Sequence, residues 1–230
     1  MRVSVIQMNQ GSDKAANLAQ AQGLIEAAIA ADRPGLVSLP ETWTNLGGGR
    51  DARMAAAEVL PAPGGEGGPA YELLRGLARR HGITVHGGSM IENGGEKLFN
   101  TTLVFGPDGA EIARYRKIHL FDITAPDGTG YRESALYGGG RDLALFEAGG
   151  IRFACTICYD VRFRSFIPRC APWGRKRFWC RPISRCKPAR IIGKRYCVHA
   201  PLIRNAGSSP PLPSANMKNA ARNAASMAIR

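Results

Sequence analysis

Short apolar runs alternate with longer amphipathic stretches in the first part of the chain. The β-branched run at 3–8 is typical of a buried strand. Residues 14–31 carry apolar side chains at helical spacing and follow Asp13, a residue type that caps helices. A second strand is predicted over 36–41 and a second helix over 70–82. This alternation favours a sheet covered by helices.

From residue 83 onward the pattern predicts mainly β-structure. A third strand is expected over 83–90. The runs 98–106 and 111–121 flank Pro-Asp-Gly and predict a hairpin. Two further strands are expected over 143–148 and 151–160, separated by a Gly-Gly pair, and the segment 122–142 is predicted to be a loop. The whole pattern predicts an α/β sandwich with a mixed sheet.

The charge distribution changes abruptly after residue 163. The chain carries a formal net charge of +13, but residues 164–230 hold 15 Lys and Arg and no Asp or Glu, so residues 1–163 are slightly acidic. We call residues 164–230 the basic tail. It also holds four of the six cysteines. Three interpretations of this tail compete: a nucleic-acid-binding extension, a metal module, or a stretch that was never selected as protein.

Three strand ends carry side chains suited to nucleophilic catalysis, namely Glu41, Lys117 and Cys158. A cysteine thiolate is a strong nucleophile, a carboxylate can act as its base, and an ammonium can stabilise an oxyanion. Each residue alone also has an ordinary structural interpretation: a solvated strand end, a surface lysine or a packed cysteine. Cys155 and Cys158 have the C-x-x-C redox spacing, but on a predicted strand rather than at the start of a helix.

Four motifs occur in order along residues 1–163: SLPET, RYRKIHLFD, YRES and CTICYDVRF. Together they resemble the nitrilase superfamily of carbon–nitrogen hydrolases, especially bacterial amidases similar to omega-amidase and deaminated-glutathione amidase. The resemblance implies α/β structure in a four-layer αββα sandwich, which is incomplete in the chain as written. It also implies hydrolysis of a carbon–nitrogen bond in a small amide, without metal or organic cofactor.

The resemblance also implies roles for individual residues. Glu41 would be the general base, Lys117 would stabilise the tetrahedral intermediate, and Cys158 would be the nucleophile. Glu133 would position substrate and relay protons, and the backbone N–H of Tyr159 would help to hold the oxyanion. In the family the nucleophile usually lies in Gly-x-x-Cys, and here Cys155 occupies the glycine position.

Other polar residues near these motifs are interpreted as structural. Asn100 and Thr101 are expected to form hydrogen bonds within the hairpin. Asp160 and Arg162 are expected to form an ion pair behind the nucleophile turn. The histidines have no metal-ligand spacing and receive no role from the resemblance.

The resemblance ends near Phe163, where the basic tail begins. Codons permitted for residues 183–206, read one frame over, can encode FTLQTGKDHWEALLRARAIDTQC, which resembles the segment that the family has at this place. We therefore predict two parts: residues 1–163, the hydrolase domain through the nucleophile, and residues 164–230, a frameshifted and disordered tail. The form as written is expected to be inactive, and the form with the frame restored is expected to be a homodimer.

A binding function remains the alternative, with a nucleic-acid-binding tail on an inactive hydrolase-like domain. The tail offers positive charge and aromatic side chains. It lacks a recognisable nucleic-acid-binding motif, and Cys180, Cys186, Cys197 and His199 lack the close paired spacing of common zinc sites. The N-terminus shows no signal-peptide pattern and no run is long enough to span a membrane, so a cytoplasmic location is expected.

Overall fold

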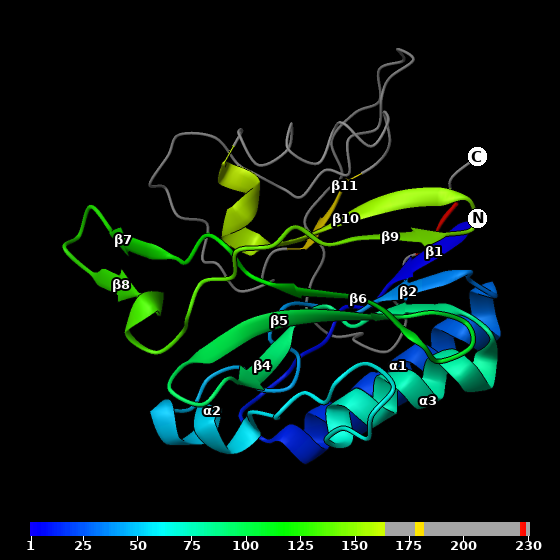
Figure 1. Ribbon diagram of the computed structural model, residues 1–230, viewed down its shortest axis with the longest axis horizontal. Helices are drawn as coiled ribbons and strands as arrows, with labels where there is room; N and C mark the ends of the chain where they lie inside the picture. The colour runs from blue at the N-terminus through cyan, green and yellow to red at the C-terminus, as the bar shows by residue number, and fades with distance from the viewer. Residues whose placement is uncertain (164–177, 182–225, 229–230) are drawn as a thin grey trace, which may run out of the picture.

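The computed structural model describes residues 1–163 together with two short strands from the basic tail, 178–181 and 226–228. Three α-helices and ten strands lie in the first part (Figure 1). The helices are α1 (Lys14–Asp32), α2 (Arg50–Ala56) and α3 (Pro69–His81). The other tail residues lie outside the described residues. The predictions of disorder, zinc binding and base stacking for them are therefore not tested by the structure.

The larger sheet has the strand order β12-β1-β2-β3-β5-β4, and β6 pairs with β5. Strands β1, β2 and β3 are parallel, whereas β5 runs antiparallel to β3, β4 and β6. The strands are β1 (Arg2–Val5), β2 (Leu36–Ser38), β3 (Thr84–His86), β4 (Met90–Asn93), β5 (Leu98–Phe105), β6 (Glu111–Arg116) and β12 (Ser226–Ala228). The predicted mixed sheet and its hairpin are therefore confirmed.

A second sheet contains β9 (Leu145–Ala148), β10 (Ile151–Ile157) and β11 (Phe178–Arg181). Strand β10 is antiparallel to β9 and parallel to β11. In Figure 1, α1 and α3 lie side by side against one face of the larger sheet, and β9 and β10 lie on its other side. The order of layers is thus helix, sheet, sheet. The second helical layer implied by the resemblance is not among the described residues.

Both long helices have clear start and stop signals. The Asp13 side chain accepts a hydrogen bond of 3.1 Å from the N–H of Ala16 and caps α1. Helix α3 begins at Pro69, and the buried carboxylate of Glu58 accepts hydrogen bonds from the N–H groups of Ala70 and Tyr71. A carboxylate at this end also complements the helix dipole. Gly82, with φ of 61°, ends α3 in the left-handed conformation that favours glycine.

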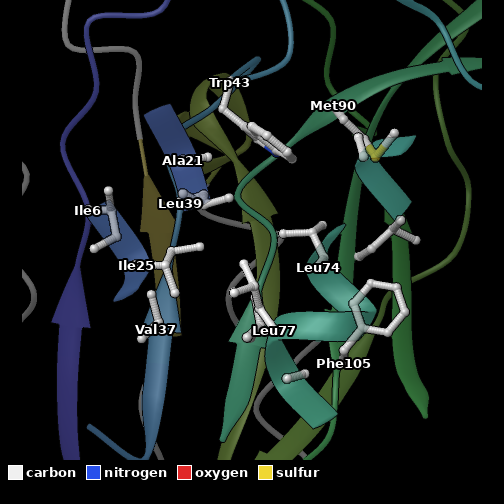
Figure 2. Packing of buried hydrophobic residues seen from close by; sticks show 14 of the residues in the cluster. Ile6, Ala21, Ile25, Val37, Leu39, Trp43, Leu74, Leu77, Met90 and Phe105 are labelled. Carbon is white, nitrogen blue, oxygen red and sulfur yellow. The ribbon is translucent and has the colours of Figure 1, made fainter. Parts of the chain in front are cut away.

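Two apolar cores separate the three layers. The first lies between the helices and the larger sheet. Figure 2 shows Leu74 and Leu77 pointing toward Val37 and Leu39. The second lies between the two sheets and joins Val104 and Tyr115 of the hairpin to residues of β9 and β10. Strand β10, which leads to Cys158, is therefore held against the larger sheet by apolar packing, and this confirms the predicted α/β sandwich.

Several local predictions need correction. The single strand expected over 83–90 is interrupted, because β3 ends at His86 and β4 begins at Met90. The segment 122–142, predicted to be a loop, contains β7 (Asp122–Thr124), β8 (Gly130–Arg132) and the short 3-10 helix η1 (Glu133–Ala135). Helix α2 was not predicted, because its seven residues carry too short an apolar pattern. Strand β10 ends at Ile157, and the next residues form the 3-10 helix η2 (Cys158–Arg162) rather than continuing the strand.

No helix in the described part of the chain is both long enough and apolar enough to span a lipid bilayer.

Candidate active site

Four predicted site residues come from four separate segments and meet in space. Glu41 follows β2, Lys117 follows β6, and Glu133 opens η1. Cys158 opens η2, directly after the central strand of the smaller sheet. The site therefore lies where the ends of the larger sheet and of β10 meet. The structure brings all four together through Lys117 and Glu41, as the contacts below show.

The carboxylate of Glu41 is buried, with only 3% of the residue exposed. Its Oε1 accepts a hydrogen bond of 3.0 Å from Asn100 Nδ2 and lies 3.7 Å from Lys117 Nζ. The thiol of Cys158 is also within hydrogen-bonding reach of this carboxylate. Burial raises the pKa of Glu41 above its ordinary value, although Lys117 and Asn100 act in the opposite direction. A carboxylate with a raised pKa beside a thiol is suited to accept its proton.

Lys117 lies between two carboxylates and is only 2% exposed. Its Nζ donates hydrogen bonds of 2.8 and 3.1 Å to the two carboxylate oxygens of Glu133. Burial by itself lowers the pKa of Lys117, but Glu41, Glu133 and Cys158 more than offset this, and the pKa lies above its usual value. The side chain therefore stays a cation, as an oxyanion stabiliser must.

Glu133 is held in place by the backbone as well as by Lys117. Its Oε2 accepts a hydrogen bond of 2.6 Å from the N–H of Phe121. The side chain is 16% exposed, more than those of Glu41 and Lys117. Glu133 is thus the carboxylate of this group nearest to solvent, in a position consistent with the predicted contact to substrate.

Cys158 adopts an unusual backbone conformation, with φ of 47°. Residues other than glycine rarely occupy this left-handed region, and such strain often occurs at functional sites. The sharp turn ends β10 and starts η2, so that the half-buried thiol lies beside Glu41. The N–H groups of the first turn of a helix have no partner within it. Tyr159, the predicted oxyanion donor, lies in this turn, and its ring packs edge-on against Phe121.

Asp160 anchors this turn from behind and is completely buried. Its carboxylate accepts hydrogen bonds of 2.6 Å from the Tyr115 hydroxyl and 3.0 Å from the N–H of Ile157. It also accepts one of 2.9 Å from the N–H of His119 and lies 2.7 Å from His119 Nδ1. These contacts give Asp160 a structural role and tie η2 to the end of the β5–β6 hairpin, with His119 as the ion-pair partner of Asp160, while the predicted pair with Arg162 stays a prediction.

Removing this anchor is expected to destabilise the fold. Asp160→Ala leaves the Tyr115 hydroxyl, the Ile157 N–H and the His119 groups without their acceptor, and we expect the free energy of unfolding to fall by about 3 kcal/mol. Tyr115→Phe removes one of these hydrogen bonds and should cost only about 1 kcal/mol. Urea unfolding followed by circular dichroism measures both. Equal losses for the two variants would contradict a central role for the carboxylate.

Asn100 belongs to the site, although sequence reasoning gave it only a hairpin role. Besides its contact with Glu41, its backbone C=O accepts a hydrogen bond of 2.9 Å from the N–H of Lys117. Its amide is one of three polar side chains in the strand LFNTTLVF, so the sequence did not single it out. Cys155, in contrast, is 1% exposed in the core between the sheets, and neither Cys155 nor Cys158 forms a disulfide.

Comparison with known proteins gives a consistent result. The family model for carbon-nitrogen hydrolase matches residues 2–172. Omega-amidase NIT2 of Danio rerio is 38% identical over 162 residues, which cover 70% of this chain and 56% of that protein. The chloroplastic omega-amidase of Arabidopsis thaliana is also 38% identical over 162 residues, covering 70% of this chain and 43% of that protein. The chain spans about half the length of these curated relatives.

Solved structures share the fold. Nit3 of Saccharomyces cerevisiae, a member of branch 10 of the nitrilase superfamily, has a TM-score of 0.68 at 27% identity, covering 79% of this chain and 64% of that one. XC1258 of Xanthomonas campestris, a CN-hydrolase superfamily protein, has a TM-score of 0.58 at 32% identity, covering 72% of this chain and 56% of that one. The family model, the relatives and the fold agree, and the chain belongs to the carbon–nitrogen hydrolase family of the nitrilase superfamily.

Proposed function

We propose that this protein is an amidase that hydrolyses the carbon–nitrogen bond of a small carboxamide through a cysteine thioester. One observation carries the proposal: a half-buried thiol, a buried carboxylate with a raised pKa and a buried ammonium lie together at Cys158, Glu41 and Lys117. This is the set of groups that a covalent acyl transfer requires. Family membership and the omega-amidase names of the relatives support it.

In the first half-reaction Glu41 takes the proton of the Cys158 thiol, and Sγ attacks the carbonyl carbon. The resulting oxyanion is stabilised by Lys117 and by the backbone N–H of Tyr159. When the tetrahedral intermediate collapses, the carbon–nitrogen bond breaks and Glu41 returns the proton to the leaving nitrogen. Ammonia departs, and the acyl group remains on Cys158 as a thioester.

In the second half-reaction water replaces ammonia. Glu41 takes a proton from the water, and the oxygen attacks the thioester carbon. Lys117 and the Tyr159 N–H stabilise the oxyanion again. The carbon–sulfur bond then breaks, the carboxylic acid leaves, and the proton on Glu41 restores the Cys158 thiol. Glu133, which holds Lys117 and is the most exposed carboxylate of the group, would position the substrate.

The preferred substrate is proposed to be a small omega-amide, in line with the printed names of the curated relatives. The assay measures ammonia release from such an amide. The rate is compared with the rates for the corresponding nitrile and the corresponding N-carbamoyl compound, each assayed separately. Faster turnover of the nitrile or of the N-carbamoyl compound would change the proposed substrate class and leave the proposed thiol mechanism in place.

We also propose that the codons beyond Phe163 are read one frame away from the original. The absence of acidic residues in the basic tail and the permitted codons for 183–206 support this. Inserting one base near the Phe163 codon is expected to give a protein that releases ammonia, whereas the 230-residue form is expected to be inactive. Both forms are purified and assayed side by side. Ammonia release by the 230-residue form, with strong hydrogen-exchange protection throughout 164–230, would contradict the frame proposal.

A second candidate function follows from the charge of the basic tail, which has 15 basic and no acidic residues. Such a tail would bind single-stranded nucleic acid through its phosphates. Salt-dependent binding of a labelled oligonucleotide by the 230-residue form, but not by the form with the inserted base, would favour this function over hydrolysis.

The oligomeric state and the cellular location of the protein are also proposals. We propose that the form with the inserted base is a homodimer and that the protein is cytoplasmic. Light scattering on the purified form and fractionation of the source cells test these two statements.

A further inference from the structure

Asn100 lies in β5 and contacts the side chain of Glu41 and the backbone of Lys117. Its side-chain Nδ2 donates to Glu41 Oε1 at 3.0 Å, and its backbone C=O accepts from the N–H of Lys117 at 2.9 Å. Asn100 is itself 3% exposed. One residue of the hairpin therefore fixes the distance between a carboxylate that follows β2 and a lysine that follows β6.

The amide of Asn100 has only one possible orientation here. A carboxylate can only accept hydrogen bonds when ionised, so the group facing Glu41 must be the NH₂. This leaves Asn100 Oδ1 buried without a hydrogen-bond partner among the described residues. A buried acceptor without a partner destabilises a fold. An asparagine at this position therefore costs stability, and its benefit lies in what its NH₂ does for Glu41.

The hydrogen bond from Asn100 and the ion pair with Lys117 both fall on one oxygen of Glu41, Oε1, and Oε2 has no hydrogen-bond partner among the described residues. The other titratable groups that act on this carboxylate are Glu133, Cys158 and Tyr137. Because Oε1 already has a donor and a cation beside it, Oε2 is the oxygen left to take up a proton.

We propose that Asn100 is a positioning residue for the general base: it holds Oε1 of Glu41 so that Oε2 receives the proton of the Cys158 thiol. This inference rests on the proposed function, because it assumes that Glu41 is the base. It adds a residue that acts through Glu41 and does not itself exchange a proton. The same hydrogen bond favours the ionised carboxylate, so losing it raises the pKa of Glu41 further.

The test follows the alkylation of Cys158 by iodoacetamide against pH, read by mass spectrometry of the peptide that contains Cys158. It uses the full 230-residue chain and requires no turnover. In the proposed mechanism Cys158 and Glu41 exchange a proton, so the acidic limb of the profile reports the titration of the two groups together. We expect Asn100→Ala to move the midpoint of this limb upward by about one pH unit. Asn100→Asp should move it further, because it places a second carboxylate beside Glu41.

A matched control and a double variant separate positioning from a merely structural role. Thr102→Val removes a buried hydrogen bond from the same strand, to the C=O of Gly88, and should leave the midpoint unchanged. In a Glu41→Gln background, Asn100→Ala should cause no further shift, because the group it acts on is gone. Asn100→Asp keeps the side-chain shape and serves if the alanine variant does not fold.

The outcomes distinguish the inference from the proposed function. If Glu41→Gln itself leaves the acidic limb unchanged, Glu41 is not the base and the proposed mechanism fails. If Glu41→Gln changes the limb but neither Asn100 variant does, only the positioning role is overturned. A shift in Asn100→Ala that persists in the Glu41→Gln background would also overturn it, because the effect would not pass through Glu41.

Discussion

Replacing Cys158 with alanine is expected to abolish ammonia release from a carboxamide in the active form of the protein. The substitution removes the sulfur atom that carries the proposed thioester, and neither Glu41 nor Lys117 can take its place as a nucleophile. Cys158→Ser should be almost as inactive, because a serine hydroxyl is a much weaker acid than a thiol and Glu41 would have to remove a far less acidic proton.

The control for this prediction is Cys155→Ala. Cys155 lies three residues earlier, in the core between the two sheets, and is 1% exposed. This variant loses one buried sulfur but no group of the site, so ammonia release should persist. Substantial ammonia release by Cys158→Ala would remove Cys158 from the mechanism. Loss of activity in Cys155→Ala, with the fold intact by circular dichroism, would favour a working pair of the two cysteines.

The second large effect is expected at Glu41 and Lys117. Glu41→Gln keeps the size of the side chain and removes its ability to accept a proton, and kcat should fall by at least about 100-fold. Because burial raises the pKa of Glu41, the activity of the unmodified protein should decline as the pH falls through that raised value and the base becomes protonated. The residual activity of Glu41→Gln should lack this acidic limb.

Lys117→Ala should reduce kcat by a similar factor of about 100, because the oxyanion loses its cation. It also leaves the buried Glu41 and the partly exposed Glu133 without a positive charge between them, so the fold must be checked by urea unfolding. Arg114→Ala is the matched control. Arg114 lies in β6, the strand that Lys117 follows, and its guanidinium pairs with Glu111 rather than with the site. An unchanged kcat in Glu41→Gln or Lys117→Ala would return that residue to a structural role.

The long elements could be predicted because their patterns are local and redundant. Helix α1 has a capping residue, good helix formers and apolar spacing, and the structure places it at Lys14–Asp32, within one residue of the prediction. The β5–β6 hairpin has two β-rich runs around a Pro-Asp-Gly turn. Each of these segments carries several independent signals that agree.

The hairpin of β7 and β8 was missed although it carries the same turn signal. Residues 126–128 are again Pro-Asp-Gly, Gly128 has φ of 84°, and Asp127 accepts a hydrogen bond from the N–H of Thr129. Its strands have three residues each and are largely exposed, so no alternation of apolar and polar positions marks them. The turn chemistry alone would have found this hairpin.

The candidate site was predictable in its residues but not in its geometry. Four motifs named Glu41, Lys117, Glu133 and Cys158, and the structure brings these residues together. Nothing in the sequence shows that Lys117 touches both carboxylates, because that contact depends on how the hairpin lies on the sheet. Asn100 could not be recognised, since an amide in a strand has many ordinary partners and only the fold selects Glu41.

Lys117 and its two carboxylates have a consequence for how the protein responds to salt. When Glu41 and Glu133 are ionised, the three side chains carry one net negative charge in a region with little exposure. In the proposed reaction a proton passes between Cys158 and Glu41, the carboxamide enters neutral and ammonia leaves neutral, so the total charge stays the same through acylation. No counter-ion has to enter or leave the buried region. Dissolved ions screen exposed charges over about 10 Å but act weakly on buried ones. The rate of the acylation step should therefore depend little on ionic strength.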